Sequence, residues 1–225
     1  MISFYDVGYK VSDFKSEKKI FTGLNVNFLK DERVGIYAAS GSGKSTLAKL
    51  ISGIESPTEG NIYRNGKVSW PIGFAGFFHP ELSGYDNVLL ISQMAQVDPY
   101  KMISICKQIG LLREEMSRPL KKFSPASRAI LGYCCSISTS ADIYVADEVI
   151  SVGDSTMRLK CDAYINILLE NSSLIFISKN LNQLKKYCNK FYVLINSNLI
   201  ECSSLDVADK AIKDWNNALM QDVKL

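Results

Sequence analysis

The residue types best suited to chemistry stand together at positions 38–46, where the chain reads AASGSGKST. An apolar run at 34–37 precedes this segment and a helical pattern at 47–51 follows it, so the segment is expected to lead from a strand into a helix. Gly41 and Gly43 permit positive φ angles that bring backbone amides close to an anion. Because the following helix would direct its positive end to the same point, the pattern predicts a phosphate-binding loop.

The polar residues of this loop suit a nucleotide. The Lys44 ammonium can pair with β- and γ-phosphates, and the Ser45 hydroxyl can ligate Mg²⁺. The strict pattern G-x-x-x-x-G-K-[ST] would place glycine at Ala38, so the match is one residue short. A Gly/Ser-rich turn that binds nothing is the alternative, but strand, loop, Lys-Ser-Thr and helix all occur in the required order. The predicted nucleotide-binding residues are Ser40, Gly41, Ser42, Gly43, Lys44, Ser45 and Thr46.

Composition bounds the class of protein. A chain of 225 residues is long enough for one sizeable α/β domain. A net charge of +3 with interspersed signs is not the clustered basicity of a nucleic-acid binder, so we expect no nucleic-acid partner. The six cysteines form no C-x-x-C pair, which argues against zinc and favours reduced core thiols. We expect no leader or membrane span, so membrane association would come through a partner.

The periodicity predicts an α/β fold. Two strands at 2–7 and 20–29, joined by a polar connection at 12–19, suggest a small N-terminal antiparallel sheet. Asn65-Gly66 predicts a hairpin over 61–70. From residue 33 onward, strands alternate with helices, which implies a mostly parallel core sheet. The expected strands are 143–148, 173–178 and 191–195, and the expected helices are 155–170, 181–187 and 205–220.

A helical subdomain is predicted at approximately 85–138, within a single domain spanning 1–225. The apolar residues from 85 to 112 recur mostly at helical spacing. Ser124 followed by Pro125 is the start signal of a helix that runs to about Ser138. The last amphipathic helix carries Trp215 on its apolar side.

Two carboxylates, Asp147 and Glu148, end the apolar strand at 143–148. Two solvated acids at a strand end are common in α/β folds, but residues 151–154, Ser-Val-Gly-Asp, follow closely. The strand resembles the Walker B element of ATP-binding cassette (ABC) proteins, and the later segment resembles their D-loop. The resemblance implies that Asp147 helps to hold Mg²⁺ and that Glu148 polarises the attacking water, as ATP hydrolysis requires.

The stretch at 70–73 and 76–88 is similar to the ATPase subunits of polysaccharide exporters, and the single-domain length is closest to the capsule exporters. The resemblance implies an ABC nucleotide-binding domain that binds ATP and Mg²⁺ and dimerises head to tail, most simply as a homodimer. It further implies an ABC-2 type permease partner, and a peripheral location on the cytoplasmic face of the inner membrane. The exported substrate would be a lipid-linked polysaccharide.

Four segments depart from the family pattern. His79 stands where a glutamine is usual, and an imidazole there can hydrogen-bond a metal-bound water or serve only the fold. In the signature segment, Ser124 keeps a hydroxyl for the partner's γ-phosphate, whereas Pro125 removes an amide and Ala126 adds a Cβ. Lys179 occupies the switch-histidine position and supplies charge without imidazole's ability to relay a proton.

The fourth departure is Val11, where the family has an aromatic residue that stacks on adenine; Tyr9 or Phe14 are possible substitutes. Two functions are compatible with these features. Glu148 favours an exporter ATPase, whereas the relaxed positions favour a degenerate ABC subunit that binds ATP with little hydrolysis. A P-loop kinase or GTPase is disfavoured because the D-loop is present and the Asn-Lys-x-Asp pattern is absent.

Overall fold

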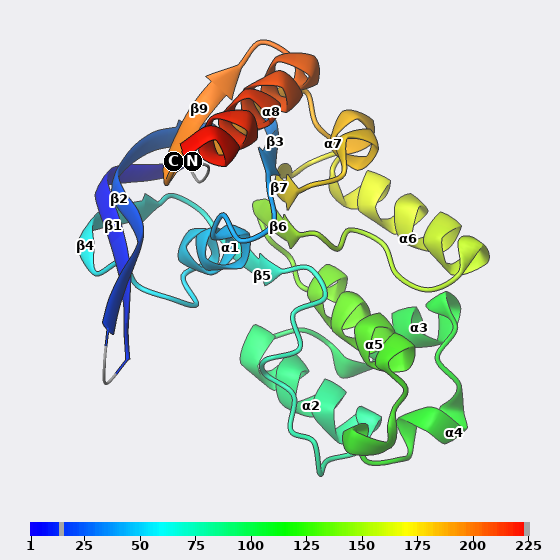
Figure 1. Ribbon diagram of the computed structural model, residues 1–225. Helices are drawn as coiled ribbons and strands as arrows, with labels where there is room; N and C mark the ends of the chain where they lie inside the picture. Colours follow the sequence, from blue (N-terminus) through cyan, green and yellow to red (C-terminus); the bar gives the residue numbers. More distant parts are fainter. Residues whose placement is uncertain (14–15, 223–225) are drawn as a thin grey trace. The chain divides into compact units, whose positions relative to one another are not determined.

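The computed structural model describes residues 1–13 and 16–222 of the chain (Figure 1). Its internal contacts divide the chain into two compact units. The first comprises Met1–Val68, Ile143–Glu148 and Ser173–Leu225, and the second comprises Ser69–Asp142 and Val149–Ser172. The predicted phosphate loop and both Walker B carboxylates belong to the first unit.

An antiparallel sheet opens the first unit. It has the order β2-β1-β4, with β1 at Ile2–Asp13, β2 at Ser16–Phe28 and β4 at Glu59–Arg64. The predicted N-terminal antiparallel sheet is therefore confirmed. The predicted polar connection at 12–19 is wrong, because pairing between β1 and β2 continues to Asp13 opposite Ser16. A two-stranded ribbon is held by its ladder of backbone hydrogen bonds, so polar side chains do not end it.

The predicted hairpin at 61–70 is also wrong. β4 pairs with β1, with Phe4 opposite Ile62, rather than with β5 at Val68–Pro71. This register packs Ile62 against the core around Phe4. Burial of that apolar face outweighs the local preference of the Asn65-Gly66 turn for a hairpin.

The core sheet of the first unit carries the phosphate loop. Its strands lie in the order β6-β7-β3-β8-β9, and they span Ile143–Asp147, Ser173–Ser178, Arg33–Ala38, Lys190–Ile195 and Asn198–Cys202. β3 is parallel to β7 and β8, β6 is parallel to β7, and β9 is antiparallel to β8. The predicted mostly parallel sheet is confirmed. Parallel pairing places the carboxyl ends of β3, β6 and β7 at one edge.

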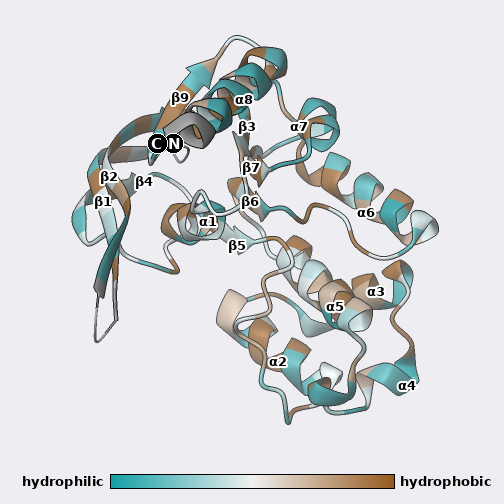
Figure 2. Cartoon of the chain, viewed as in Figure 1, coloured by the Kyte–Doolittle hydropathy of each residue, from teal (hydrophilic) through white to brown (hydrophobic). Residues whose placement is uncertain are grey.

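Helices cover both faces of this sheet. α1 at Lys44–Ser52 joins a core cluster with alternate residues of β3, such as Val34 and Ile36, while Tyr37 of the same strand packs toward the opposite cluster. α7 at Leu181–Tyr187 and α8 at Leu205–Asp222 also pack on the sheet. Figure 2 shows brown and teal residues alternating along α8, as its predicted amphipathic character requires.

The second unit is mostly helical, and its four longer helices each begin with a capping side chain. Its helices are α2 at Gly84–Ala95, α3 at Pro99–Ile109, α4 at Arg113–Met116, the 3₁₀ helix η1 at Leu120–Lys122, α5 at Pro125–Ser138 and α6 at Ser155–Leu168. Ser83 and Asp86 form a capping box at α2, and Asp154 caps α6. The predicted start of α5 after Ser124 is confirmed. The boundary of a helical subdomain at 85–138 stays a prediction.

All six cysteines are buried free thiols, as predicted. Among the residues that the structure describes, no helix combines the length and the apolar character needed to cross a bilayer.

The packing around Gly43 predicts that substitution of this glycine costs more stability than substitution of Gly41. A Cβ at Gly43, with φ 93°, would lie 2.8 Å from Ile20 Cγ2, whereas a Cβ at Gly41, with φ 81°, meets no described atom within 4 Å. Both alanine substitutions force an unfavourable backbone, at about 1 kcal/mol, but Gly43→Ala adds a steric clash of about 1–3 kcal/mol. Urea unfolding should therefore show Gly43→Ala as clearly less stable than Gly41→Ala; equal losses would contradict this packing.

Candidate functional site

The phosphate loop is tied back on itself at the carbonyl of Ala39. Lys44 Nζ donates to this oxygen at 2.9 Å, and Ser42 Oγ donates to it at 2.8 Å. Ala38, the departure from the strict pattern, is fully buried at the end of β3. Its methyl group packs in the core cluster, so the alanine side chain does not occupy the space inside the loop where a phosphate would bind.

The amino end of α1 offers unsatisfied backbone donors. Within the described chain, no side chain caps this helix, and its first turn carries no acidic residue. Gly43 precedes it in a left-handed conformation, followed by Lys44, Ser45 and Thr46. Free amide groups and the helix dipole favour an anion here. The loop and helix together can therefore bind phosphate groups.

Asp147 lies at the end of β6 close to the start of α1. Burial raises the pKa of its carboxyl group above the ordinary value, and the nearby charge of Glu148 raises it further. A hydrogen bond with Ser45 and the charge of Lys44 act in the opposite direction. Asp147 Oδ1 is buried and has no hydrogen-bond partner among the described residues. A buried carboxylate oxygen without a partner, beside a serine hydroxyl, fits a hard divalent cation.

The Mg²⁺ site would depend on phosphate oxygens as well as protein. The described residues contain no group of three or more His, Cys, Asp and Glu side chains suited to a metal. Mg²⁺ usually takes one or two carboxylates together with substrate phosphates and water. The predicted ligands Ser45 and Asp147 fit that pattern.

Glu148 is the next residue along the chain and is held by three groups. Its carboxylate lies 3.3 Å from Lys44 Nζ, accepts a hydrogen bond from Ser178 Oγ at 2.9 Å, and accepts one from the Lys179 amide at 3.3 Å. Its backbone has φ 59°, a left-handed conformation that costs a residue other than glycine about 1–3 kcal/mol. The side chain remains one-third exposed. A carboxylate fixed in this way can meet a water molecule from solvent.

Sequence reasoning missed Ser178. This fully buried serine ends β7, and its hydroxyl also accepts a hydrogen bond from the Asn180 amide at 3.0 Å. Lys179 meets Glu148 through its backbone amide, while its own side chain is exposed. The position of Ser178 was the one sign in the sequence that could have revealed it, because a hydroxyl at the end of a strand next to β6 must approach the Walker B carboxylates.

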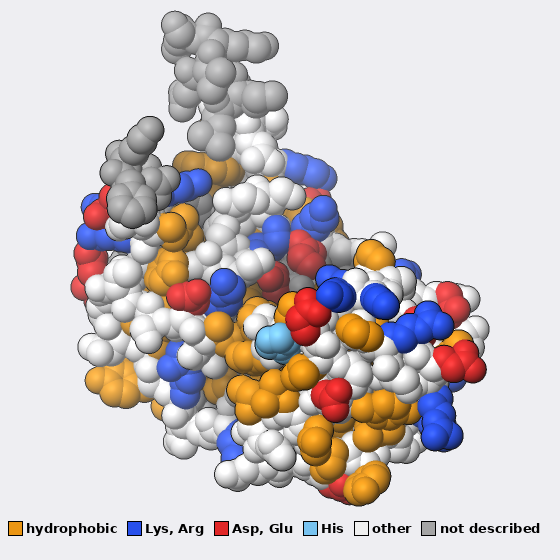
Figure 3. Space-filling model, turned by 90° about the horizontal axis from the view of Figure 1, so that it is seen from below, with side chains coloured by type: hydrophobic (Ala, Val, Ile, Leu, Met, Phe, Trp, Pro, Cys, Tyr) orange, Lys and Arg blue, Asp and Glu red, His pale blue; other side chains and the backbone are white. Residues whose placement is uncertain are grey.

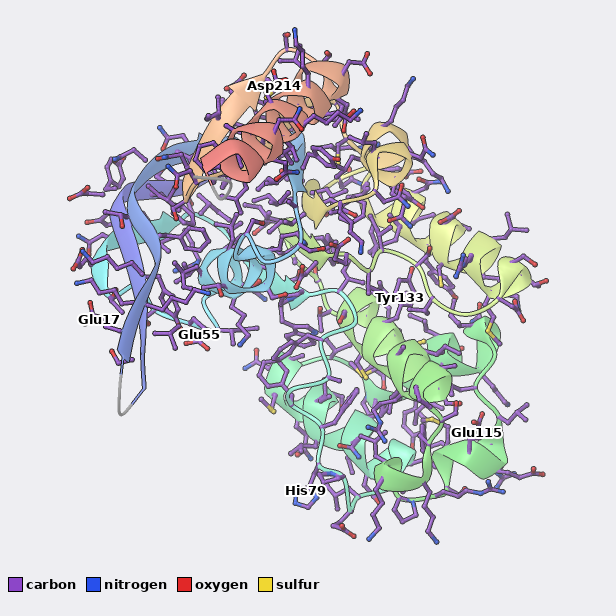
Figure 4. All side chains as sticks on the ribbon, viewed as in Figure 1. Glu17, Glu55, His79, Glu115, Tyr133 and Asp214 are labelled. Atoms are coloured by element: carbon purple, nitrogen blue, oxygen red, sulfur yellow. The ribbon has the colours of Figure 1, made fainter. Side chains whose placement is uncertain are left out.

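Two further predicted residues, His79 and Ser124, belong to the second unit. His79 is exposed (Figure 3), and Figure 4 shows it on the loop that leads to α2. Asn87 holds this loop, since its Oδ1 accepts from the His79 amide at 2.8 Å and its Nδ2 donates to the His79 carbonyl at 3.1 Å. Glu81 donates its amide to His79 Nδ1 at 3.3 Å. The imidazole is thus oriented by its own loop.

Ser124 is the N-cap of α5. Its Oγ accepts a hydrogen bond from the Ser127 amide at 3.0 Å, and Ser124, Pro125 and Ala126 are all exposed. The helix start is therefore accessible to a ligand brought by another molecule.

The sequence profile of the ABC transporter family matches residues 21–151, more than half of the chain. The chain belongs to the ABC transporter family. The "ATP-binding protein BexA" of Haemophilus influenzae is 36% identical over 191 residues, covering 85% of this chain and 88% of that protein. The "Capsule polysaccharide export ATP-binding protein CtrD" of Neisseria meningitidis serogroup B is 32% identical, covering 92% of this chain and 96% of CtrD.

Solved structures agree on the ABC fold. The dimeric post-hydrolysis structure of the ATP-binding cassette MJ0796, bound to ADP and Pi, superposes with a TM-score of 0.74 at 18% identity, covering 88% of this chain and 96% of that chain. The predicted family and fold class are confirmed.

The residues of β1 that bear on stacking against adenine are Val11 and Tyr9. Val11 is exposed, and the hydroxyl of Tyr9 donates to Glu55 at 3.2 Å. Phe14 lies outside the described residues.

Asp147→Asn tests the cation site. Because the folded state raises the pKa of this carboxyl, its contribution to stability falls as pH rises from the unfolded-state pKa through the folded-state pKa. At neutral pH the free variant should therefore be no less stable than wild type in thermal unfolding. The added stabilisation by Mg²⁺ with ATP should be lost, as measured with and without EDTA. A large loss of stability in the free variant would instead assign Asp147 a structural role.

Proposed function

We propose that this ABC protein is the ATP-binding, energy-coupling subunit of an exporter that moves a lipid-linked capsule polysaccharide across the cytoplasmic membrane. The observation that carries the proposal is the convergence of Lys44, Asp147 and Glu148 in a chain with capsule-export relatives. The parallel sheet supplies all three from the edge where β3 and β6 end.

The roles of the residues derive from their positions. The amides at the start of α1 and the Lys44 ammonium bind the phosphates. Ser45 and Asp147 hold Mg²⁺, which neutralises negative charge on those phosphates. Glu148 accepts a proton from the attacking water, and Ser178 with the Lys179 amide keeps its carboxylate in place. Lys44 exchanges its contact with Glu148 for the phosphates when nucleotide binds.

The partners are a second copy of the chain and an ABC-2 type permease, with this subunit peripheral on the cytoplasmic face. The exposed start of α5 supports the dimer, because the Ser124 hydroxyl and the Ala126 amide can meet a phosphate bound by the other copy. The loop that Asn87 fixes around His79 leads straight into α2, which exposes Leu90 and Met94, one helical turn apart on the same face. An exposed apolar helix face of this kind suits docking to the permease.

Steady-state phosphate release by the purified protein, with and without permease, tests the ATPase proposal. Glu148→Gln keeps the shape of the side chain but removes the base, so turnover should fall about 100-fold or more while ATP binding persists. Lys44→Ala should weaken ATP binding itself. Absence of turnover in the wild type, even with permease present, would replace the proposal with the degenerate ATP-binding subunit.

Substitutions at Ser178 and Lys179 separate two of the three groups that hold Glu148. Ser178→Ala removes a hydrogen bond to a charged group and should lower kcat about tenfold, with KM for ATP nearly unchanged. Lys179→Ala retains the backbone amide and should change kcat less than about twofold. Ser178→Thr, which keeps the hydroxyl, should restore most of the activity. A larger effect at Lys179 than at Ser178 would show that the ammonium group acts directly.

A further inference from the structure

A cavity of about 360 Å³ opens beside the phosphate loop, within the first unit. Ala39–Ser42 form one wall, Ile20 of β2 another, and the β8–β9 turn and α8 complete it. The volume falls in the range of about 300–1,000 Å³ that is typical of small-molecule sites. Because the loop itself is a wall, a ligand whose phosphates occupy the loop has this cavity within reach.

The walls of the cavity are fixed by hydrogen bonds and packing. Asn196 and Ser197 have φ 46° and 62°, as in a two-residue type I′ hairpin turn. Ser197 Oγ donates to the carbonyl of Ile20 at 2.7 Å, which ties this turn to β2. This hydrogen bond holds the turn against β2, where it lines the cavity.

α8 is likewise held in place by a hydrogen bond and by packing. Tyr37 of β3 donates its hydroxyl to Asp209 at 3.1 Å, and Ile212 packs into the cluster beneath the helix. Trp215 lies three residues beyond Ile212, on the same side of the helix, and lines the cavity. Its ring is half-buried, so one part remains accessible.

The chemistry of the lining matches a nucleobase. An indole ring provides a stacking surface, Ile20 adds apolar contact, and the amide groups of Asn196 and Asn216 offer hydrogen bonds to a base edge. We propose that Trp215 on the C-terminal helix stacks on the base of the bound nucleotide. This inference rests on the proposed ATP-binding function and adds to it the residue that recognises the base.

The aromatic contact would thus come from the end of the chain rather than from β1. In β1, Val11 occupies the position where the family has an adenine-stacking aromatic, and it has no ring. The hydroxyl of Tyr9 donates a hydrogen bond to Glu55. β2 contributes Lys18 and Lys19 to the same cavity, and their charges suit an anionic ligand.

Tryptophan fluorescence gives a direct readout, because the chain has two tryptophans. Trp70 belongs to the second unit, where its Nε1 donates to Ser136 Oγ at 2.8 Å. In a Trp70→Phe protein, Trp215 is the single emitter. ATP should change its emission saturably, whereas inorganic tripolyphosphate, which has no base, should leave it unchanged. An equal response to both ligands, or none to ATP, would overturn the proposal.

Binding constants from calorimetry provide the second test. Trp215→Leu keeps apolar packing but loses the aromatic face, and should weaken ATP binding about tenfold, within the range for base–aromatic stacking. Trp215→Phe should restore most of this affinity, and tripolyphosphate should bind all three proteins alike. Thermal unfolding checks that the variants are folded, and Trp215→Ala is the more disruptive comparison. Unchanged ATP affinity in Trp215→Leu, or equal losses for both ligands, would exclude stacking.

The binding measurements distinguish failure of the proposed ATP-binding function from failure of the role proposed for Trp215. A wild-type protein that binds neither ATP nor tripolyphosphate would remove ATP binding itself. A protein that binds ATP with full affinity without Trp215 would retain the proposed function and overturn only the role of this residue.

Discussion

Parallel pairing of β6, β7 and β3 is the constraint on which the site depends. Each strand delivers functional groups at its carboxyl end: β3 leads into the phosphate loop, β6 ends in two carboxylates, and β7 ends in a serine hydroxyl and an amide. These groups are far apart in the sequence. Only the common direction of the strands brings Lys44 and Ser178 close to the carboxylate of Glu148.

The two carboxylates at this end of the sheet, Asp147 and Glu148, differ in burial and in the number of partners. Asp147 is desolvated and keeps one oxygen without a described partner, whereas Glu148 has three partners. The two adjacent carboxylates therefore experience different surroundings. The first suits a cation and the second suits a proton, so two adjacent residues are fitted for the two different roles proposed for them.

Features encoded by local sequence were predictable, and those set by register were not. The glycine loop, the Ser124-Pro125 helix start and the apolar Walker B strand each occupy a few consecutive residues with characteristic preferences. The pairing of β4 with β1 depends on packing of Ile62 against distant residues, so the Asn65-Gly66 turn misled. Ser178 became visible only when β7 was placed beside β6, because its function depends on a neighbour 30 positions away.

The contact between Lys44 and Glu148 gives the proposed mechanism an order of events. Lys44 Nζ lies 3.3 Å from the Glu148 carboxylate. Under the proposed function the same ammonium binds phosphate, so a nucleotide and the carboxylate compete for one cation. Nucleotide binding would then be an ion exchange, in which one anion displaces another from the same lysine. The exchange would release the carboxylate from its ion pair at the point where a phosphate stands to be attacked.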